Sequence, residues 1–484
     1  MIDAVIIGGG LSGLTCAVAL ADRGLQVVVV EREALPGGRA RSWIDQTTGD
    51  TVDIGPHVVQ SEYRNMLALL KRLGTSELIT WQSRKVLTIA SSPHPFSLRH
   101  WPLPVPLSLM PSMLTAPGPP LYDHLSAAKT IWRGMQFGEE EVAALDRISA
   151  QAFLRSQGMT QRMIDWWWAF ASMVTTNVPV DRCSAAAIMR IHAQLSGHRN
   201  LHFGFGAVGL AELYAPQAVD IVQTSGGKFL TQTHVRGFIG VDRAEAILLN
   251  DGTRLRARHF VSAVPPQDLA LLLPDAWKEH MAFETLSCFE PCPYISCYLW
   301  FDRKIRCPRF ISHLCSPTRL NYDFYDLSRI RRGWKNRPSI FASNIIYSHR
   351  AQGMSDKEIV QATVREIIEF APDAAHARVL HSRVHRIPMA IPCPLPGTEV
   401  RRPHTQTAIP GLVLAGDWVR TQLPYCMESA VCSGWLAAEQ VLAERGTPHR
   451  LAFPPRPYDG LAGLVRRATQ WYRRRSTSSP SEAG

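Results

Sequence analysis

The sequence predicts an α/β fold in which helices cover a parallel sheet and a second domain of mixed helices and strands is inserted. Two apolar strands, at residues 5–7 and 26–30, enclose a predicted helix at 14–23, and such a strand–helix–strand unit is typical of a parallel sheet. Another buried apolar strand at 411–415 leads into a helix that begins at Met427. The 484 residues, 46% of them hydrophobic, suffice for two or three cores and so leave room for the inserted domain.

The turn between the first strand and the first helix contains Gly8, Gly10 and Gly13. In a Rossmann-type unit the first glycine permits the tight turn, the second lets the backbone approach a pyrophosphate, and the third lets the helix pack on the strand. Leu11 and Ser12 lie in the same turn, near a helix N-terminus that offers free N–H groups to an anion. Glu31 follows the second strand, where it is placed to accept hydrogen bonds from a ribose. The unit therefore predicts a dinucleotide site.

A second glycine loop decides which dinucleotide is expected. Glu31 suits NAD or FAD equally, but Gly37-Gly38-Arg39 brings another backbone loop and a guanidinium to the same anion, and a nicotinamide site usually lacks that clamp. FAD is therefore the predicted cofactor, with Arg32 beside Glu31 included in its site. The stretch from Glu31 to Arg39 resembles the signature of the large flavoprotein family that contains amine oxidases, protoporphyrinogen oxidases and carotenoid desaturases.

Other phrases narrow the resemblance. Four segments look most like hydroxysqualene dehydroxylase and plant-type phytoene desaturases. They are Asp-Ile-Gly-Pro-His at 53–57, the helical segment 63–74, the proline-rich apolar insert at 93–121 and the segment 414–439. The similarity spans roughly residues 1–445. It implies a Rossmann-type FAD-binding domain, a parallel sheet with helices, carrying an inserted α+β substrate domain.

The resemblance also implies a division of the chain. The predicted FAD-binding domain is discontinuous and consists of residues 1–90, 205–275 and 385–445. The predicted substrate domain lies between these parts, at 91–204 and 276–384. A basic tail follows at 446–484. Within the substrate domain we expect a strand at 294–301 and a helix at 356–370, and within the FAD-binding domain a strand over 228–235.

The family likeness implies further cofactor contacts. Gly55, Pro56 and His57 are expected to face the flavin, and Val235 to hold the adenine through its backbone. Gly416 and Asp417 are expected to reach the ribityl or pyrophosphate region. The helix that starts at Met427 and Glu428 aims its positive end at the flavin pyrimidine oxygen, where charge appears on reduction.

His57 and Tyr425 are the candidates for proton handling. The unperturbed pKa of histidine lies near neutrality, which suits an acid or base, although a histidine in this position also serves simply to hydrogen-bond the cofactor or the backbone. Among Trp166, Trp167 and Trp168, one or two are expected to line a pocket, because consecutive helical residues point in different directions. The sequence offers no Ser-His-Asp arrangement and no metal cluster.

The predicted reaction is hydride transfer at an allylic carbon of a long-chain isoprenoid, either dehydroxylation of hydroxysqualene to squalene or phytoene-type desaturation. Such chemistry needs a dry apolar site and few catalytic side chains, because the cofactor carries the difficult step. The alternative is a flavin amine oxidase or a protoporphyrinogen-oxidase-like enzyme that uses oxygen. Cys426 stands where amine oxidases usually place a caging aromatic, which weakens the amine interpretation. A non-catalytic flavin protein that delivers lipid is a third possibility, and the redox partner or acceptor, quinone or oxygen, is left open.

The charge of the chain favours an anionic surface as a partner. The formal net charge is +11, and the tail from Arg445 onward contains eight arginines against two carboxylates. Its segment 461–475 reads as a short basic amphipathic helix whose aromatics suit an anionic membrane leaflet rather than nucleic acid. The proline-dense insert 93–121 is either a buried cap over a pocket or a lip that dips into the bilayer interface.

The ten cysteines form no Cys-x-x-Cys pair, so reduced and mostly buried thiols are expected. No apolar run reaches about 18 residues. We therefore expect a cytoplasmic protein that is peripheral at the inner face of the membrane and binds a long-chain isoprenoid or another apolar small molecule.

Overall fold

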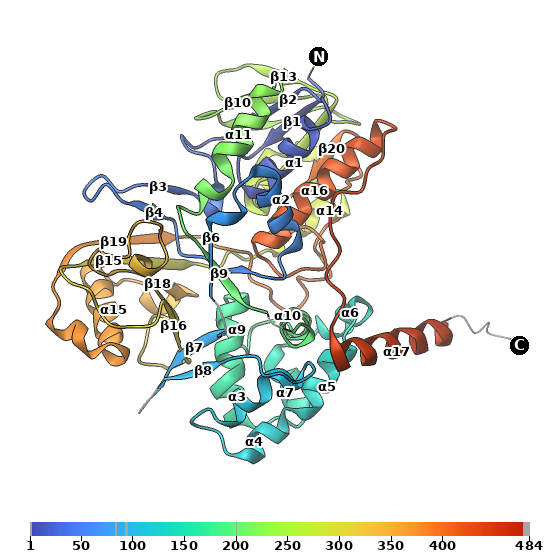
Figure 1. Cartoon of the computed structure of the whole chain (residues 1–484). Helices are drawn as coiled ribbons and strands as arrows, with labels where there is room; N and C mark the ends of the chain where they lie inside the picture. Colours follow the sequence, from blue (N-terminus) through green and yellow to red (C-terminus); the bar gives the residue numbers. More distant parts are fainter. Residues whose placement is uncertain (1, 83–84, 92–94, 200, 478–484) are drawn as a thin grey trace, which may run out of the picture.

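The computed structural model describes residues 2–82, 85–91, 95–199 and 201–477. Its first layer is a five-stranded sheet with the order β10-β2-β1-β14-β20, in which every neighbouring pair is parallel (Figure 1). In that order the strands are Lys228–Leu230, Val27–Val30, Ala4–Ile7, His259–Ser262 and Leu412–Leu414. The predicted parallel sheet is confirmed.

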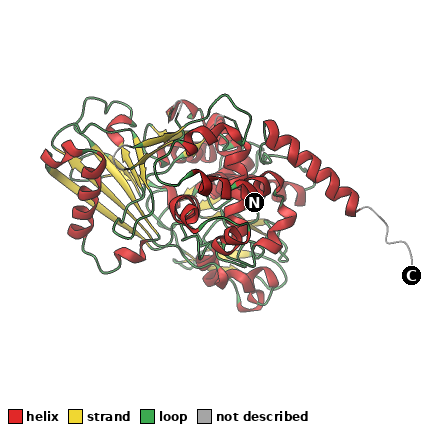
Figure 2. Cartoon of the chain, turned by 90° about the horizontal axis from the view of Figure 1, so that it is seen from below, coloured by secondary structure: helices red, strands yellow, loops and turns green. Residues whose placement is uncertain are grey.

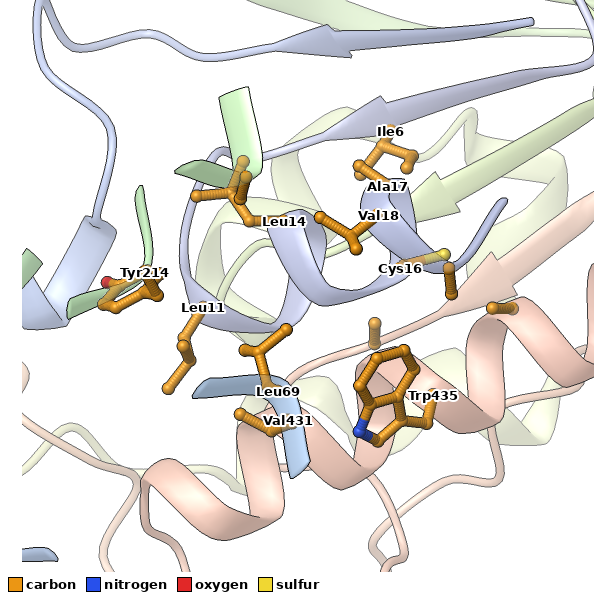
Figure 3. Packing of buried hydrophobic residues seen from close by; sticks show 14 of the residues in the cluster. Ile6, Leu11, Leu14, Cys16, Ala17, Val18, Leu69, Tyr214, Val431 and Trp435 are labelled. Carbon is orange, nitrogen blue, oxygen red and sulfur yellow. The ribbon is translucent and has the colours of Figure 1, made fainter. Parts of the chain in front are cut away.

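Helices cover one face of this sheet and a smaller sheet covers the other. The helices are α1 (Leu11–Ala21), α2 (Arg64–Leu73), α11 (Ala215–Thr224) and α16 (Met427–Glu444). Figure 3 shows Leu11 of α1 near Leu69 of α2 and Val431 of α16, in a cluster that also contains Leu14, Val18 and Trp435. On the opposite face, alternate strand residues pack against the antiparallel sheet β11-β12-β13 and the helix α12; these elements are Val235–Ile239, Ala246–Leu249, Arg254–Arg256 and Pro266–Leu272.

Two local predictions in this layer were wrong. The first helix begins at Leu11 rather than at residue 14, because Gly13 is not a helix breaker here: a Cβ at Gly13 would lie 2.0 Å from the Gly8 carbonyl oxygen, so close packing favours glycine inside the helix. The expected strand at 228–235 is divided into β10 and β11. Gln232 adopts a φ of 51°, and its N–H donates to the carbonyl of Glu33, which turns the chain between the two strands.

The second layer is a seven-stranded sheet with the order β19-β15-β18-β17-β16-β7-β8. In that order its strands are Val379–Ile387, Tyr294–Phe301, Ile340–Ile346, Asp323–Asp326, Phe310–His313, Leu87–Ala90 and Phe96–Leu98. Odd-numbered residues of β15 pack against the helix α15 (Asp356–Phe370), whereas its even-numbered residues face an aromatic core on the other side. The strand and helix expected at 294–301 and 356–370 are confirmed.

A helical layer lies at the opposite end of the molecule from the parallel sheet (Figure 1). Its members are α3 (Met110–Leu114), α4 (Leu121–Ser126), α5 (Ala128–Gln136), α6 (Val142–Leu145), α7 (Ala150–Ser156), α8 (Gln161–Met163), α9 (Ala169–Thr176) and α10 (Ala185–Gly197). A π-helical turn at Ile164–Trp168 joins α8 to α9 and carries the three tryptophans. The proline-rich insert leads into this layer and, among its described residues, forms only short elements, as proline density requires.

Smaller elements connect the layers. They are the hairpin β3-β4 (Ser42–Ile44 and Thr51–Asp53), the sheet β5-β9-β6 (Val59–Gln60, Phe203–Gly206 and Ile79–Trp81), and the short helices α13 (Asp275–Lys278) and α14 (Met281–Glu284). The strands of the five-stranded sheet come from all three ranges predicted for the cofactor domain. β7 falls within the first of those ranges but pairs with β16, because Leu87 and Ile89 join the aromatic core of the seven-stranded sheet.

The tail forms the helix α17 (Gly460–Thr477), which begins against the body of the protein and then extends away from it (Figures 1 and 2). Its first turn packs on α5 and α10, and the Ala462 N–H donates to the Val105 carbonyl. None of the described helices combines the length and apolarity that a membrane crossing requires.

Candidate functional site

Two glycine loops meet at the carboxyl end of the parallel sheet. The Gly37 N–H donates to the carbonyl of Gly9 at 2.9 Å, and Gly10 and Gly37 form a short parallel bridge. Gly8 and Gly38 have φ values of 105° and 54°, which L side chains rarely adopt. A Cβ on Gly38 would approach the Gly10 Cα to 3.2 Å, so the side-chain-free surfaces of the two loops face each other.

Glu31 lies beside these loops, buried at the end of β2. Its carboxylate accepts the Gly9 N–H at 2.7 Å and the Glu33 N–H at 2.9 Å. These bonds fix the orientation of the carboxylate on the same cavity that Val235 borders. The contact of Glu31 with a ribose stays a prediction, and Glu31 borders the cavity in which it would be made.

Two helix N-termini open onto the same cavity without a side-chain cap. α1 starts after Gly10 and α16 starts after Cys426, and neither preceding residue caps the helix with its side chain. Leu11, Ser12 and Met427 border the cavity. Uncapped N–H groups together with the positive dipole end favour an anion, so the donor set at the N-termini of α1 and α16 fits a dinucleotide and would hold its anionic or electron-rich groups.

Arg39 forms an ion pair that the sequence did not reveal. Its guanidinium donates to both Asp417 oxygens, at 2.6 and 3.2 Å, and to the carbonyl of Ala390 at 3.1 Å. Asp417 is buried, whereas the Arg39 side chain is 30% exposed. The pair therefore ties the second glycine loop to the segment after β20, and both side chains border the cavity.

The segment 54–57 is held against β15. The Ser296 hydroxyl donates to the Ile54 carbonyl at 2.6 Å, and a Cβ on Gly55 would lie 3.3 Å from the Tyr294 ring. His57 Nδ1 is 2.8 Å from the Gly55 carbonyl, so Nδ1 carries the proton and Nε2 remains the acceptor. Burial lowers the pKa of His57, which keeps the ring neutral at neutral pH.

Tyr425 is positioned by a buried arginine. The Arg402 guanidinium lies 4.6 Å from the Tyr425 ring centroid and donates to the carbonyls of Asp417, Val419 and Leu423. Glu399 pairs with Arg402 and also with Arg190 of α10. Burial raises the pKa of Tyr425 well above 10, so the phenol stays protonated. Tyr425 can therefore donate a hydrogen bond but is a poor proton acceptor.

Glu428 has a role that the sequence did not suggest. Its carboxylate accepts the backbone N–H groups of Asn65 and Met66 and the side-chain amide of Asn65, at 2.8 to 2.9 Å. These are N–H groups of the first turn of α2, so Glu428 caps that helix from α16. The carboxylate is thus already satisfied by the protein.

The structure brings most of the predicted residues to one cavity. Its wall includes Gly8, Gly10, Leu11, Ser12, Glu31, Arg32, Gly37, Gly38, Arg39, Gly55, Pro56, His57, Val235, Asp417, Tyr425, Met427 and Glu428. Gly13 and Gly416 are not part of this wall. Gly13 packs on Gly8, and the Gly416 N–H donates to Ser433 in a turn with a φ of 139°. These two glycines shape the backbone rather than border the cavity.

The cavity continues from the glycine loops into the substrate side, with a total volume of about 960 Å³. There its wall is largely aromatic and aliphatic; it includes Trp167, Trp168, Phe170, Val174, Ile188, Leu195, Phe203, Phe310 and Tyr325. Two of the three tryptophans thus line it, while Trp166 stacks on Phe96.

A small polar group interrupts this apolar wall. Ser312, Asp323 and Asn344 come from adjacent strands and border the cavity together. Sequence reasoning missed them, because only the strand register brings them into contact. The one available signal was a carboxylate at 323 within an aromatic alternation.

No group of three His, Cys, Asp or Glu side chains with metal-binding geometry occurs in the described part of the chain. All ten cysteines are free thiols, and most are buried.

Comparisons with known proteins agree on the fold. A family model described as "Flavin containing amine oxidoreductase" matches residues 11–442. The 15-cis-phytoene desaturase of Synechococcus elongatus is 28% identical over 463 residues, covering 91% of this chain and 96% of that protein. The chloroplastic/chromoplastic 15-cis-phytoene desaturase of Solanum lycopersicum is 27% identical and covers 92% and 78%. Among solved structures, cyclohexylamine oxidase from Brevibacterium oxydans aligns with a TM-score of 0.68 at 17% identity, over 92% of this chain and 99% of that one.

Proposed function

The chain belongs to the flavin containing amine oxidoreductase family, as an FAD-dependent oxidoreductase of the desaturase type, and we propose that it transfers hydride at an allylic carbon of a long-chain isoprenoid. The first candidate reaction is desaturation of a phytoene-type carotenoid, because the sequence relatives that match along nearly the whole chain are phytoene desaturases. Dehydroxylation of hydroxysqualene to squalene is the second candidate, which the polar group at Asp323 favours.

The observation that carries the proposal is the shape and lining of the cavity. Its wall includes the glycine loops and Met110 and Leu114 of α3, and on the substrate side the wall is largely aromatic and aliphatic. A flexible polyene or polyprenyl chain fits such a long apolar site, whereas a small polar amine would leave most of its wall in contact with water. The walls would also exclude water from the reacting carbon.

The residues around the cavity can perform the remaining tasks. Bound FAD supplies the two-electron acceptor or donor for hydride transfer. Uncapped N–H groups of α1 and α16 and the carboxylate of Glu31 would bind it, and the Arg39–Asp417 pair holds the two segments that enclose it. His57 Nε2 is the acceptor for the proton that leaves the neighbouring carbon during desaturation. Tyr425 donates a hydrogen bond and keeps its proton.

The amine alternative is less compatible with the same site. An aromatic cage needs accessible ring faces, but the Arg402 guanidinium already lies over the Tyr425 ring. A cation in this position would repel a protonated amine, and Cys426 offers no second ring.

We further propose that the protein docks on a membrane through a surface that we name the apolar rim. The rim consists of the exposed side chains Trp101, Leu103, Leu107, Met110, Leu114, Leu121, Tyr122, Leu125 and Trp132. Met110 and Leu114 belong to the rim and also border the cavity, so the cavity reaches the surface within the rim. Nine exposed apolar side chains within residues 101–132 point to an interaction site, and the two that also border the cavity support entry of a lipid substrate from the bilayer.

The basic tail lies next to the rim. α17 begins beside Val105, close in the chain to Trp101 and Leu103, and it carries the exposed Arg467 on its way outward, whereas Arg466 donates to the Phe137 carbonyl. Cationic side chains adjacent to an apolar surface suit an anionic leaflet. This arrangement supports peripheral binding at the inner face of the membrane.

Turnover in liposomes tests the proposed function. FAD-loaded protein is incubated separately with phytoene and a quinone acceptor, with hydroxysqualene and a reductant, and with primary amines in air. The expected result is a product two hydrogens lighter than phytoene, or squalene from hydroxysqualene, without peroxide from the amines. Peroxide release from an amine together with unchanged isoprenoids would contradict the proposal.

A further inference from the structure

A row of polar side chains crosses the cavity face of the seven-stranded sheet. In the strand register Ser312 lies opposite Asp323, Asp323 opposite Asn344, and Asn344 opposite Ser296. Residues directly opposite each other in an antiparallel sheet point to the same face. The four side chains therefore follow one another across β16, β17, β18 and β15, on a face that is otherwise largely aromatic and aliphatic.

The centre of the row is buried and only partly satisfied. Asp323 is 7% exposed and Asn344 is 5% exposed, yet both border the cavity. The Ser312 hydroxyl donates to Asp323 Oδ1 at 2.6 Å, whereas Asn344 Oδ1 is buried without a hydrogen-bond partner in the described part of the chain. A buried acceptor without a partner is unfavourable, so a ligand that brings a donor to this polar group binds more tightly.

The charge state of the carboxyl group adds to this requirement. Burial raises the pKa of Asp323 to about 6, and among the described residues only the neutral side chains of Ser312 and Asn344 oppose this shift. The other titratable groups that face it are Tyr294 and Tyr325, whose pKa values burial raises well above 10. At neutral pH the site thus presents a carboxylate, a strong hydrogen-bond acceptor, to an apolar cavity.

We propose that Asp323 and Asn344 form a subsite that binds one hydroxyl group of an otherwise apolar substrate. The carboxylate of Asp323 accepts the single O–H proton, Asn344 lies beside it on β18, and the hydrocarbon walls accommodate the rest of the chain. The substrate class that this site selects is an isoprenoid alcohol. The inference deepens the proposed function and depends on it.

The position of the subsite relates the hydroxyl to the reaction centre. The row ends at Ser296, which holds the Ile54 carbonyl next to Gly55 and His57. With strands about 4.8 Å apart, Asn344 and Asp323 lie about 5 and 10 Å from Ser296 across the sheet. A hydroxyl bound there is held within one or two isoprene units of the segment predicted to face the flavin.

A matched pair of ligands tests the subsite. Squalene and hydroxysqualene differ by the hydroxyl group, and their affinities for oxidised, FAD-loaded protein are measured in detergent micelles through the perturbation of the flavin visible spectrum. Oxidised flavin cannot reduce either ligand, so the readout is binding and not activity. The wild-type protein is expected to bind hydroxysqualene at least tenfold more tightly than squalene. In the variants Asp323→Leu and Asn344→Leu, the affinities for the two ligands are expected to agree within about twofold. The tenfold preference of the wild-type protein corresponds to one or two hydrogen bonds, which leucine cannot make.

Ser343→Ala is the matched control, because Ser343 precedes Asn344 on the opposite face of β18 and its hydroxyl bonds to the Cys297 carbonyl. It should keep the full preference. If a leucine variant does not fold, the wild-type protein at varied pH replaces it: the preference should fall as the pH drops through about 6, since a carboxylate is the stronger acceptor.

Equal wild-type affinities, or a preference that survives in the leucine variants, would overturn the subsite and leave the isoprenoid function intact. Failure of both ligands to bind would instead overturn the dehydroxylation candidate together with the subsite, and failure to bind phytoene as well would overturn the proposed function.

Discussion

Replacing two leucines of the apolar rim by aspartate should release the protein from lipid vesicles. Leu121 and Leu125 of α4 are each 62% exposed. Complete burial of a leucine is worth about 1.5–3 kcal/mol, so each of them still has about 1–2 kcal/mol to gain from insertion into a bilayer. Together they contribute about 2–4 kcal/mol, which corresponds to a change of about 30- to 700-fold in the vesicle partition coefficient.

The assay is co-flotation of FAD-loaded protein with vesicles that contain anionic lipid. The double variant Leu121→Asp/Leu125→Asp is compared with the control Val241→Asp/Leu380→Asp. Val241 is 74% exposed and Leu380 is 65% exposed, and both lie in other parts of the molecule. Both double variants change the net charge equally, so only the rim variant should leave the vesicles while retaining FAD. Equal partitioning of the two variants would refute docking through the rim.

Three further predictions address the tail, the cofactor loops and Asp323. A chain that ends at Arg467 retains the packed start of α17 but loses three of the tail arginines. Its binding to anionic vesicles at low salt should therefore weaken by about 3 kcal/mol. Vesicle sedimentation at rising salt concentration should show this difference between the two chains disappear. Gly38→Ala should lose FAD in an equilibrium titration, because the added Cβ would approach Gly10. Gly353→Ala is the control, because Gly353 also has a positive φ, of 80°, but no atom lies within 4 Å of the added Cβ. This variant carries similar backbone strain and should keep FAD. The folded-state pKa of Asp323 is about 6, above its ordinary value of 3.8, so the protonated carboxyl stabilises the fold fully below pH 3.8 and this stabilisation is lost as the pH rises through 6. In chemical denaturation, the unfolding free energy of Asp323→Asn should rise by up to about 3 kcal/mol relative to that of the wild type between pH 4 and pH 7. A difference that stays constant over this range would contradict the burial argument.

Features with a strong local cause could be predicted from the sequence. The helix at 356–370 follows a capping box in which Ser355 and Glu358 satisfy each other's backbone N–H groups, and the strand at 294–301 is apolar apart from Ser296, so both were located correctly. The glycine loops were recognised for the same reason, since the turn before α1 permits few other residues.

Features that depend on distant contacts could not be predicted. The division of 228–235 into two strands follows from a hydrogen bond between Gln232 and Glu33, almost 200 residues earlier. Arg39 and Asp417 pair across the whole cofactor domain, and Asp323 meets Ser312 and Asn344 only through strand register. Propensity and pattern describe neighbours in sequence, so they contain no information about these contacts.

The most direct test of the central claim is the visible spectrum of the flavin in a single anaerobic turnover. Oxidised, FAD-loaded protein on liposomes is mixed with phytoene, with no other electron acceptor present. The account predicts that the flavin band bleaches as phytoene gains a double bond, or, for the dehydroxylase alternative, that the band of the reduced protein recovers on addition of hydroxysqualene. If neither isoprenoid changes the visible band of the flavin but an amine bleaches it, the account is contradicted.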